Sequence, residues 1–166
     1  MFRAIILLPG TVLLFIPGVI LWAAEGSQFS PELSTPHQTL FWLALLTASM
    51  GLGLSGWTVT LFKEFGEGTP APWDPPKKLV VRGPYRHVRN PMIIGVILML
   101  IAEAMLFRSW PIVVWMVLFF IGNTIYFPVI EEKGLEKKFG DNYRDYKAHV
   151  PRWRPRLRAW KQTKES

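Results

Sequence analysis

Four long hydrophobic stretches, separated by polar segments, dominate the pattern of this sequence. They cover residues 4–24, 40–62, 91–107 and 111–130, and two of them exceed the ~20 apolar residues that a helix needs to cross a bilayer comfortably. The third has only 17 residues and contains Glu103, which we expect to face the far interface or to pair with Arg108. The pattern therefore predicts an all-α integral membrane protein with about four transmembrane helices.

Polar and proline-rich segments divide this single domain, residues 1–166, into four parts. Residues 1–62 hold two N-terminal helices, residues 63–90 form a linker, and residues 91–130 form a helical hairpin with a turn at 108–110. Residues 131–166 form an interfacial helix and a basic tail. A hairpin this tight returns the chain, so we expect its two polar ends to lie on the same membrane face.

Basic residues are concentrated in some connecting segments and absent from others. Segment 25–39 has no Lys or Arg, segment 63–90 has six, and the part from residue 131 onward has eleven of the 19. Because positively charged segments stay in the cytosol, we expect both termini and the linker there, with Arg108 alone on the far side. Without cysteine the chain has no disulfide or thiolate metal site, and three scattered histidines predict no metal. The size and the missing cysteine favour a prokaryotic inner membrane.

The C-terminal part combines an apolar face with a basic tail. Leu135, Phe139, Tyr143, Tyr146 and Val150 share one face of a helix that Gly140 interrupts, and this predicts a cytosolic amphipathic helix lying on the membrane surface. The tail 152–161 alternates cations with two tryptophans, which is typical of binding to anionic lipid headgroups. For a tail held this close to a bilayer we expect no nucleic-acid partner.

Candidate chemistry lies at the two polar ends of the hairpin. Segment 82–95, named here the Arg82–Gly95 segment, holds four basic residues, two prolines and two glycines. Asn90 suits a helix N-cap and Pro91 a first helical turn. Glu131-Glu132 ends the last apolar stretch, where two carboxylates oppose the helix dipole at about 0.3–1 kcal/mol each. Their partner is either a nearby cation of the chain or a cationic ligand.

Taken in order, these motifs resemble the isoprenylcysteine carboxyl methyltransferase and phospholipid methyltransferase superfamily over about residues 79–152. The resemblance implies methyl transfer from S-adenosylmethionine to a lipophilic or membrane-embedded acceptor. The motifs that carry it are Gly83-Pro84-Tyr85, Arg89-Asn90-Pro91 with Gly95, Glu131-Glu132, Phe139-Gly140 with Tyr143 and Tyr146, and Val150-Pro151-Arg152.

The resemblance also implies which residues contact the cofactor. A Gly-x-Gly in an earlier membrane helix belongs to the phospholipid branch, although close helix packing explains such glycines equally well. Backbone N–H groups around Gly83, with Arg86 and Arg89, suit the cofactor carboxylate. The implied set is Gly51, Gly53, Leu79, Val80, Gly83, Tyr85, Asn90, Pro91, Met92, Ile93, Glu131, Glu132 and Tyr143.

Three departures concern the acceptor and the chemistry. At the positions of Asn90 and Ile93 the isoprenylcysteine branch has a histidine and a tyrosine. At the position of Phe127 that branch has a substrate-binding arginine. Arg89 or Arg152 is the candidate replacement for that cation, and Glu132 is the candidate base for an amine acceptor. Two alternatives remain open: a membrane reductase of the related sterol reductase type using NADPH, and a non-enzymatic lipid-binding protein.

Overall fold

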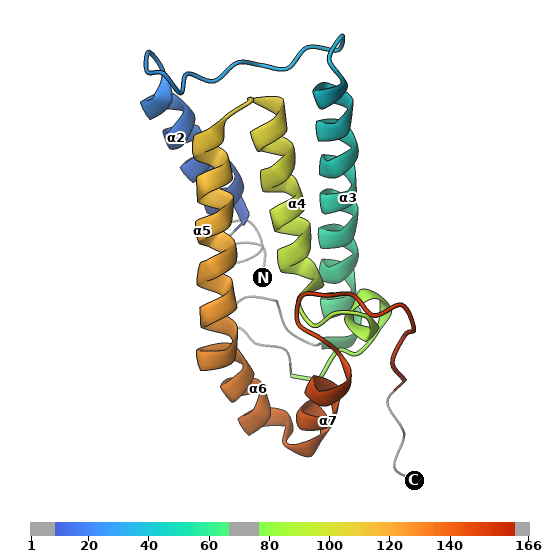
Figure 1. Ribbon diagram of the computed structural model, residues 1–166. Coiled ribbons are helices and arrows are strands. Elements are labelled where there is room, and N and C mark those ends of the chain that lie inside the picture. The colour runs from blue at the N-terminus through green and yellow to red at the C-terminus, as the bar shows by residue number, and fades with distance from the viewer. Residues whose placement is uncertain (1–8, 67–76, 162–166) are drawn as a thin grey trace.

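The computed structural model describes residues 9–66 and 77–161, and within these ranges the chain is helical or irregular, with no strand (Figure 1). The all-α prediction is confirmed. Most of the linker's proline-rich part, residues 67–76, lies outside the described residues. The helices are α2 (Ile16–Ala24), α3 (Thr39–Leu61), α4 (Pro91–Leu106), α5 (Trp110–Tyr126), α6 (Glu132–Phe139) and α7 (Asp141–His149), with π-helical turns at Thr11–Phe15, Phe62–Gly66 and Phe127–Glu131 and a 3-10 turn at Gly83–Arg86.

Two helical runs are long and apolar enough to cross a membrane by length and composition, Thr39–Gly66 and Trp110–Phe139. Thr11–Ala24 and Pro91–Leu106 are shorter apolar helices. Few residues of the two long runs are buried in the protein, and large apolar side chains such as Leu46 and Leu118 are exposed. An apolar outer surface of this extent is suited to lipid rather than water. The number of spans and the cytosolic position of the termini remain predictions.

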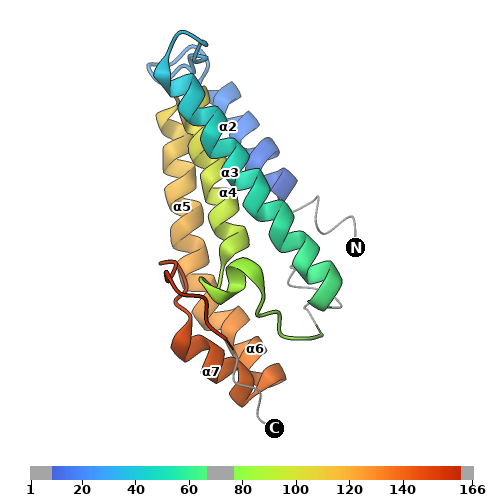
Figure 2. The same ribbon diagram turned by 90° about the vertical axis from the view of Figure 1, so that its right-hand side faces the viewer.

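Helices α3 and α4 pack side by side through small residues (Figures 1 and 2). A Cβ on Gly51 would lie 2.7 Å from the carbonyl oxygen of Gly95, and a Cβ on Gly95 would collide with the hydroxyl of Ser55. Gly53 and Gly56, by contrast, have open space around them. The packing interpretation therefore holds for Gly51 and Ser55, and it fails for Gly53 and Gly56.

The helical run that begins with α5 does not end at residue 130, where the apolar stretch ends. It continues through the wide π-helical turn Phe127–Glu131 into α6, so the prediction that the acidic pair stands at a helix C-terminus is wrong. Pro128 lies in this turn and has no backbone N–H to donate, and a π-helical turn accommodates such an interruption. The helix dipole is therefore not what the two carboxylates must be balanced against. Gly140, at φ +54°, then separates α6 from α7.

The apolar face of residues 135–150 is covered by the protein itself. Tyr143, Tyr146 and Val150 form a buried cluster with Trp160, and Leu79 packs against it. The prediction that this face lies on the membrane surface is wrong for these residues, because the end of the chain folds back over them. Trp160 is only 9% exposed, so it does not serve as the lipid anchor that its sequence context suggests.

At the other end of the bundle, the segment before α3 caps α4. The N–H and hydroxyl groups of Ser34 donate to carbonyl oxygens in the last turn of α4, at 2.7 and 2.8 Å. Such bonds satisfy carbonyls that have no partner within a helix. Arg108 pairs with Glu32 rather than with Glu103, which corrects the expected pairing. One carboxylate oxygen of Glu103 is buried without a hydrogen-bond partner.

Candidate functional site

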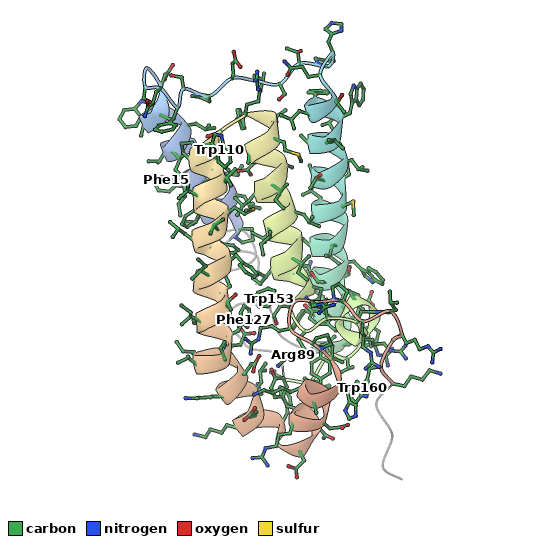
Figure 3. All side chains as sticks on the ribbon, in the orientation of Figure 1. Phe15, Arg89, Trp110, Phe127, Trp153 and Trp160 are labelled. Carbon is green, nitrogen blue, oxygen red and sulfur yellow. The ribbon has the colours of Figure 1, made fainter. Side chains whose placement is uncertain are left out.

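The Arg82–Gly95 segment and the acidic pair meet at one end of the helix bundle (Figures 1 and 3). The Nη1 group of Arg89 donates to Oε1 of Glu132 at 2.8 Å. Both side chains are nearly inaccessible to solvent. The two polar ends of the hairpin therefore come together, and we call this region the charged end.

The 3-10 turn Gly83–Arg86 is held in place by its packing on α3. Gly83 has φ +52°, and a Cβ there would lie 2.9 Å from the side chains of both Trp57 and Leu61. Only glycine satisfies both restrictions. Tyr85 is buried with Leu61 and Val80, and its carbonyl oxygen accepts a 2.7 Å hydrogen bond from the hydroxyl of Tyr146. Burial raises the pKa of Tyr85 well above its ordinary value, so the phenol stays protonated.

Several predicted cofactor residues serve to shape this region from within. Val80 packs into the Tyr85 cluster, while its neighbour Leu79 packs against the cluster of Tyr143, Tyr146 and Trp160. Tyr143 is buried, and burial together with the charge of Glu132 raises its pKa to about 12. The side chains of Val80 and Tyr143 are therefore buried in packing, whereas that of Leu79 is half-buried, and contact of these residues with a cofactor stays a prediction.

Asn90 stands at the N-cap position of α4, but its side chain makes no capping hydrogen bond. The expectation of a simple capping residue is therefore wrong. Its Nδ2 group is buried without a partner, and so is Nε of the adjacent Arg89. Buried donors without partners are rare and costly, so they mark a place where a polar group from outside the chain fits. Pro91 is buried at the first helical position, and Met92 and Ile93 are half-buried beyond it.

Glu132 is the centre of a dense ion-pair cluster and is only 3% exposed. Its Oε1 accepts hydrogen bonds from Arg89 Nη1 at 2.8 Å, and from Nε and Nη2 of Arg152 at 2.8 and 2.7 Å. The Nζ group of Lys147 lies 3.1 Å from Oε2. Both oxygens thus face cations, so Glu132 is an ion-pair partner in this structure, and its expected role as a general base stays a prediction.

Glu131 differs from its neighbour although both are acidic. It is half-buried, and among the described residues it has neither a hydrogen bond nor an ion pair. The two acids therefore divide their roles: Glu132 holds cations of the chain, and Glu131 has a carboxylate available for something else.

The position that corresponds to the substrate-binding arginine of the isoprenylcysteine branch is aromatic here. Phe127 is buried, and its ring lies 6.2 Å from that of Trp153, edge to face (Figure 3). Trp153 also contacts Phe120 at 5.1 Å. Both candidate replacements for the missing cation, Arg89 and Arg152, are bound to Glu132.

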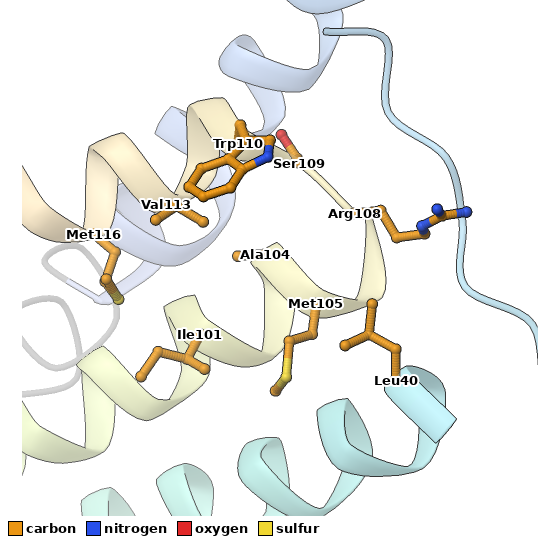
Figure 4. A pocket seen from close by; sticks show the side chains of 9 residues that line it. All are labelled: Leu40, Ile101, Ala104, Met105, Arg108, Ser109, Trp110, Val113 and Met116. Atoms are coloured by element: carbon orange, nitrogen blue, oxygen red, sulfur yellow. The ribbon is translucent and has the colours of Figure 1, made fainter. Parts of the chain in front are cut away.

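Two of the predicted residues are glycines of α3, and one cavity lies at the far end of α4. Gly51 faces Gly95 in the α3–α4 contact, and Gly53 makes no contact that a Cβ would disturb. A cavity of about 510 Å³ opens between α3, α4 and α5 at the opposite end of α4 from Arg89 (Figure 4). It is lined by Leu40, Ile101, Ala104, Met105, Arg108, Ser109, Trp110, Val113 and Met116.

Sequence reasoning missed Lys147 and misjudged Trp160. Lys147 joins Glu132 to Glu136, with its Nζ 2.7 Å from the second carboxylate, and these bonds raise the pKa of Lys147 above its ordinary value. Nothing in the local sequence distinguishes it from the other lysines on the polar side of the C-terminal helices. Within the described ranges, no group of three or more histidine, aspartate and glutamate side chains is arranged to hold a metal ion.

These features define an all-helical membrane protein with a charged, partly unpartnered site at one end of its bundle. Residues 39–142, more than half of the chain, match the model of the phospholipid methyltransferase family. The chain belongs to this family, whose members are membrane proteins and methyltransferases. No curated protein matches the sequence. The family match ends before Tyr143, so two of the cations that contact Glu132, Lys147 and Arg152, lie beyond it.

Proposed function

We propose that the protein transfers a methyl group from S-adenosylmethionine to a lipid or another lipophilic acceptor at the charged end of the bundle. The observation that carries the proposal is the free carboxylate of Glu131 together with the buried, unpartnered donors of Arg89 and Asn90. A site with both an unpaired acid and unpaired donors suits a ligand that carries both signs of charge.

S-adenosylmethionine fits this description, because it has a sulfonium and an ammonium group as well as a carboxylate. Glu131 is the residue we assign to its positive part or to its ribose hydroxyls. The Nδ2 group of Asn90 and the Nε group of Arg89 are donors suited to its acceptor atoms. The cofactor, when bound, supplies an electrophilic methyl group, and the chain's residues have to bind it, orient it and exclude water.

The surroundings of these residues are suited to orienting a bound cofactor and to excluding water from it. Methyl transfer is a displacement whose rate depends largely on the alignment of the reacting groups, so rigid walls are more important than a catalytic side chain. The buried clusters around Tyr85 and Tyr143 supply such walls on either side of residues 79–81. An amine acceptor must lose a proton before it attacks the methyl group, and Glu132 is the base that we propose for this proton.

The acceptor we favour is an amine-bearing phospholipid rather than a prenylcysteine carboxylate. A carboxylate acceptor needs a free cation, and at the corresponding position this chain has Phe127 against Trp153. The two arginines that might replace the cation are bound to Glu132. The family finding favours a methyltransferase over a reductase using NADPH and over a lipid-binding protein without enzymatic activity.

We also propose that the tail contacts lipid, as its sequence suggests, but through residues other than its tryptophans. The tryptophans are used inside the protein, whereas Leu157 is 99% exposed and lies among the exposed cations Arg154 and Arg158. We propose that this part of the tail, rather than Trp153 or Trp160, contacts anionic lipid headgroups at the cytosolic face.

The test is calorimetric titration of the purified protein with S-adenosylmethionine and with its demethylated product, followed by a labelled-methyl assay. The acceptors for the assay are phosphatidylethanolamine and a prenylcysteine analogue. We expect binding of both nucleosides and labelling of the phospholipid. Absence of binding to either nucleoside, or tight NADPH binding in their place, contradicts the proposal.

A further inference from the structure

Residues 150–160 cross back over the 3-10 turn and the start of α4 (Figure 1). We name them the C-terminal strap. The N–H group of Arg89 donates to the carbonyl oxygen of Pro151 at 2.9 Å. The N–H group of Trp160 donates to the carbonyl oxygen of Arg86 in the turn, and that of Arg156 to the carbonyl oxygen of His87 just after it, both at 3.0 Å. The strap thus forms hydrogen bonds with the backbone of the Arg82–Gly95 segment, although the strap lies outside the part of the chain that matches the family.

Aromatic side chains fix the strap at both ends. Trp160 packs on Tyr146 at 5.8 Å between ring centroids and stacks on His149 at 5.7 Å. At the other end Trp153 packs against Phe127 of the π-helical turn. The segment between these anchors therefore has little freedom to move away from the turn.

Arg152 directly precedes the Trp153 anchor and reaches Glu132 of the acidic pair. Its Nε and Nη2 groups bond to Oε1 of Glu132, the same oxygen that accepts the bond from Arg89. Lys147 approaches the other oxygen from α7. The carboxylate of Glu132 thereby connects the strap, α7 and the Arg82–Gly95 segment. Removal of any one of the three cations changes the electrostatic environment of the other two.

We propose that the C-terminal strap is a positioning element of the cofactor site and that Arg152 is its positioning residue. Through Glu132, Arg152 fixes the guanidinium of Arg89, and the strap backbone fixes the Arg89 amide. Asn90 follows directly in the chain, so the direction of its free Nδ2 depends on the same contacts. The inference rests on the proposed function for the identity of the ligand, but not for the ordering of the segment.

The ordering is tested first, on ligand-free protein, by hydrogen exchange of residues 83–90. Arg152→Ala is compared with Arg144→Ala, which removes an exposed arginine of α7 that pairs with Asp141. Arg152→Ala is expected to raise the hydrogen-exchange rate of this segment about tenfold. A tenfold change corresponds to a local opening free energy that is lower by about 1.4 kcal/mol. Equal exchange in the two variants overturns the proposal.

The effect on the site is tested by methyl-transfer kinetics. Arg152→Ala is expected to raise the KM for S-adenosylmethionine about tenfold with kcat changed less than about twofold, the pattern of lost binding rather than lost chemistry. Arg152→Lys, which keeps the charge with fewer donors, is expected to recover part of the loss and to serve if the alanine variant does not fold. A KM in both Arg152 variants equal to that of Arg144→Ala overturns the proposal. If the unaltered protein binds no S-adenosylmethionine, the proposed function fails, while the exchange result still decides the strap.

Discussion

Arg89 and Glu132 are 43 positions apart in the sequence, and their side chains are joined by a 2.8 Å hydrogen bond. Arg89 lies one residue before the N-cap of α4, and Glu132 lies just past the π-helical turn that follows α5. Their ion pair thus brings the polar ends of two apolar helices together as one site. The ion pair involves Glu132 and not its neighbour Glu131, which has no partner among the described residues. The two adjacent acids therefore have different roles.

The division between the acids is testable with one isosteric change at each. Glu132→Gln leaves Arg89 and Arg152 without their charge partner, and removing one member of a buried ion pair costs about 3 kcal/mol or more. Glu131→Gln removes no ion pair, so it should leave thermal unfolding nearly unchanged and weaken S-adenosylmethionine binding about tenfold, or by about 1.4 kcal/mol. Thermal unfolding and calorimetry measure the two effects. Equal behaviour of the two variants contradicts the assignment.

Asn90→Ala distinguishes a helix cap from a ligand contact. Loss of a working N-cap side chain costs ~1 kcal/mol of stability, but the Asn90 side chain makes no such bond. We therefore expect the melting temperature to change little and the affinity for S-adenosylmethionine to fall. Ser at this position is the matched control, because it restores a good cap without the amide donor. Loss of stability in Asn90→Ala that Asn90→Ser recovers indicates capping instead.

Alanine in place of the glycines of α3 separates packing from ligand binding. Gly51→Ala places a Cβ against the backbone oxygen of Gly95, which cannot move aside alone, and we expect destabilisation of about 1–3 kcal/mol. Gly53→Ala has open space and should be nearly neutral in stability. Thermal unfolding of both variants decides the packing role. Reduced cofactor affinity in Gly53→Ala with unchanged stability identifies Gly53 as a ligand contact after all.

Alkaline titration reports on the cluster beneath the strap. Burial raises the pKa of Tyr143 to about 12 and that of Tyr146 further, whereas an unfolded tyrosine titrates near ~10. The folded state holds these protons longer, so stability is complete below pH ~10 and is lost as the pH rises through about 12.

Tyrosinate absorbance and thermal unfolding against pH measure this loss. Tyr143→Phe should remove one late-titrating phenol and part of the pH dependence. If Tyr143→Phe removes a phenol that titrates near pH ~10, the side chain is not buried as described.

Much of this protein follows from the sequence alone. The four apolar stretches predicted the all-α fold, because a helix satisfies its own backbone in lipid and twenty apolar residues leave few other options. The motif order around Asn90 and Glu131 predicted the methyltransferase family that the family model then matched. The short connection between α4 and α5 also predicted that these two motifs lie at the same end.

Tertiary structure decided how neighbouring residues of the same type divide their roles. Glu131 and Glu132 are equivalent in the sequence, and only the approach of Arg89, Lys147 and Arg152 from distant positions makes one an ion-pair centre. Trp160 has the sequence context of a lipid anchor and becomes a core residue, because the chain folds back over Tyr146. Contacts between segments far apart in the chain determine both outcomes, and local pattern carries no information about them.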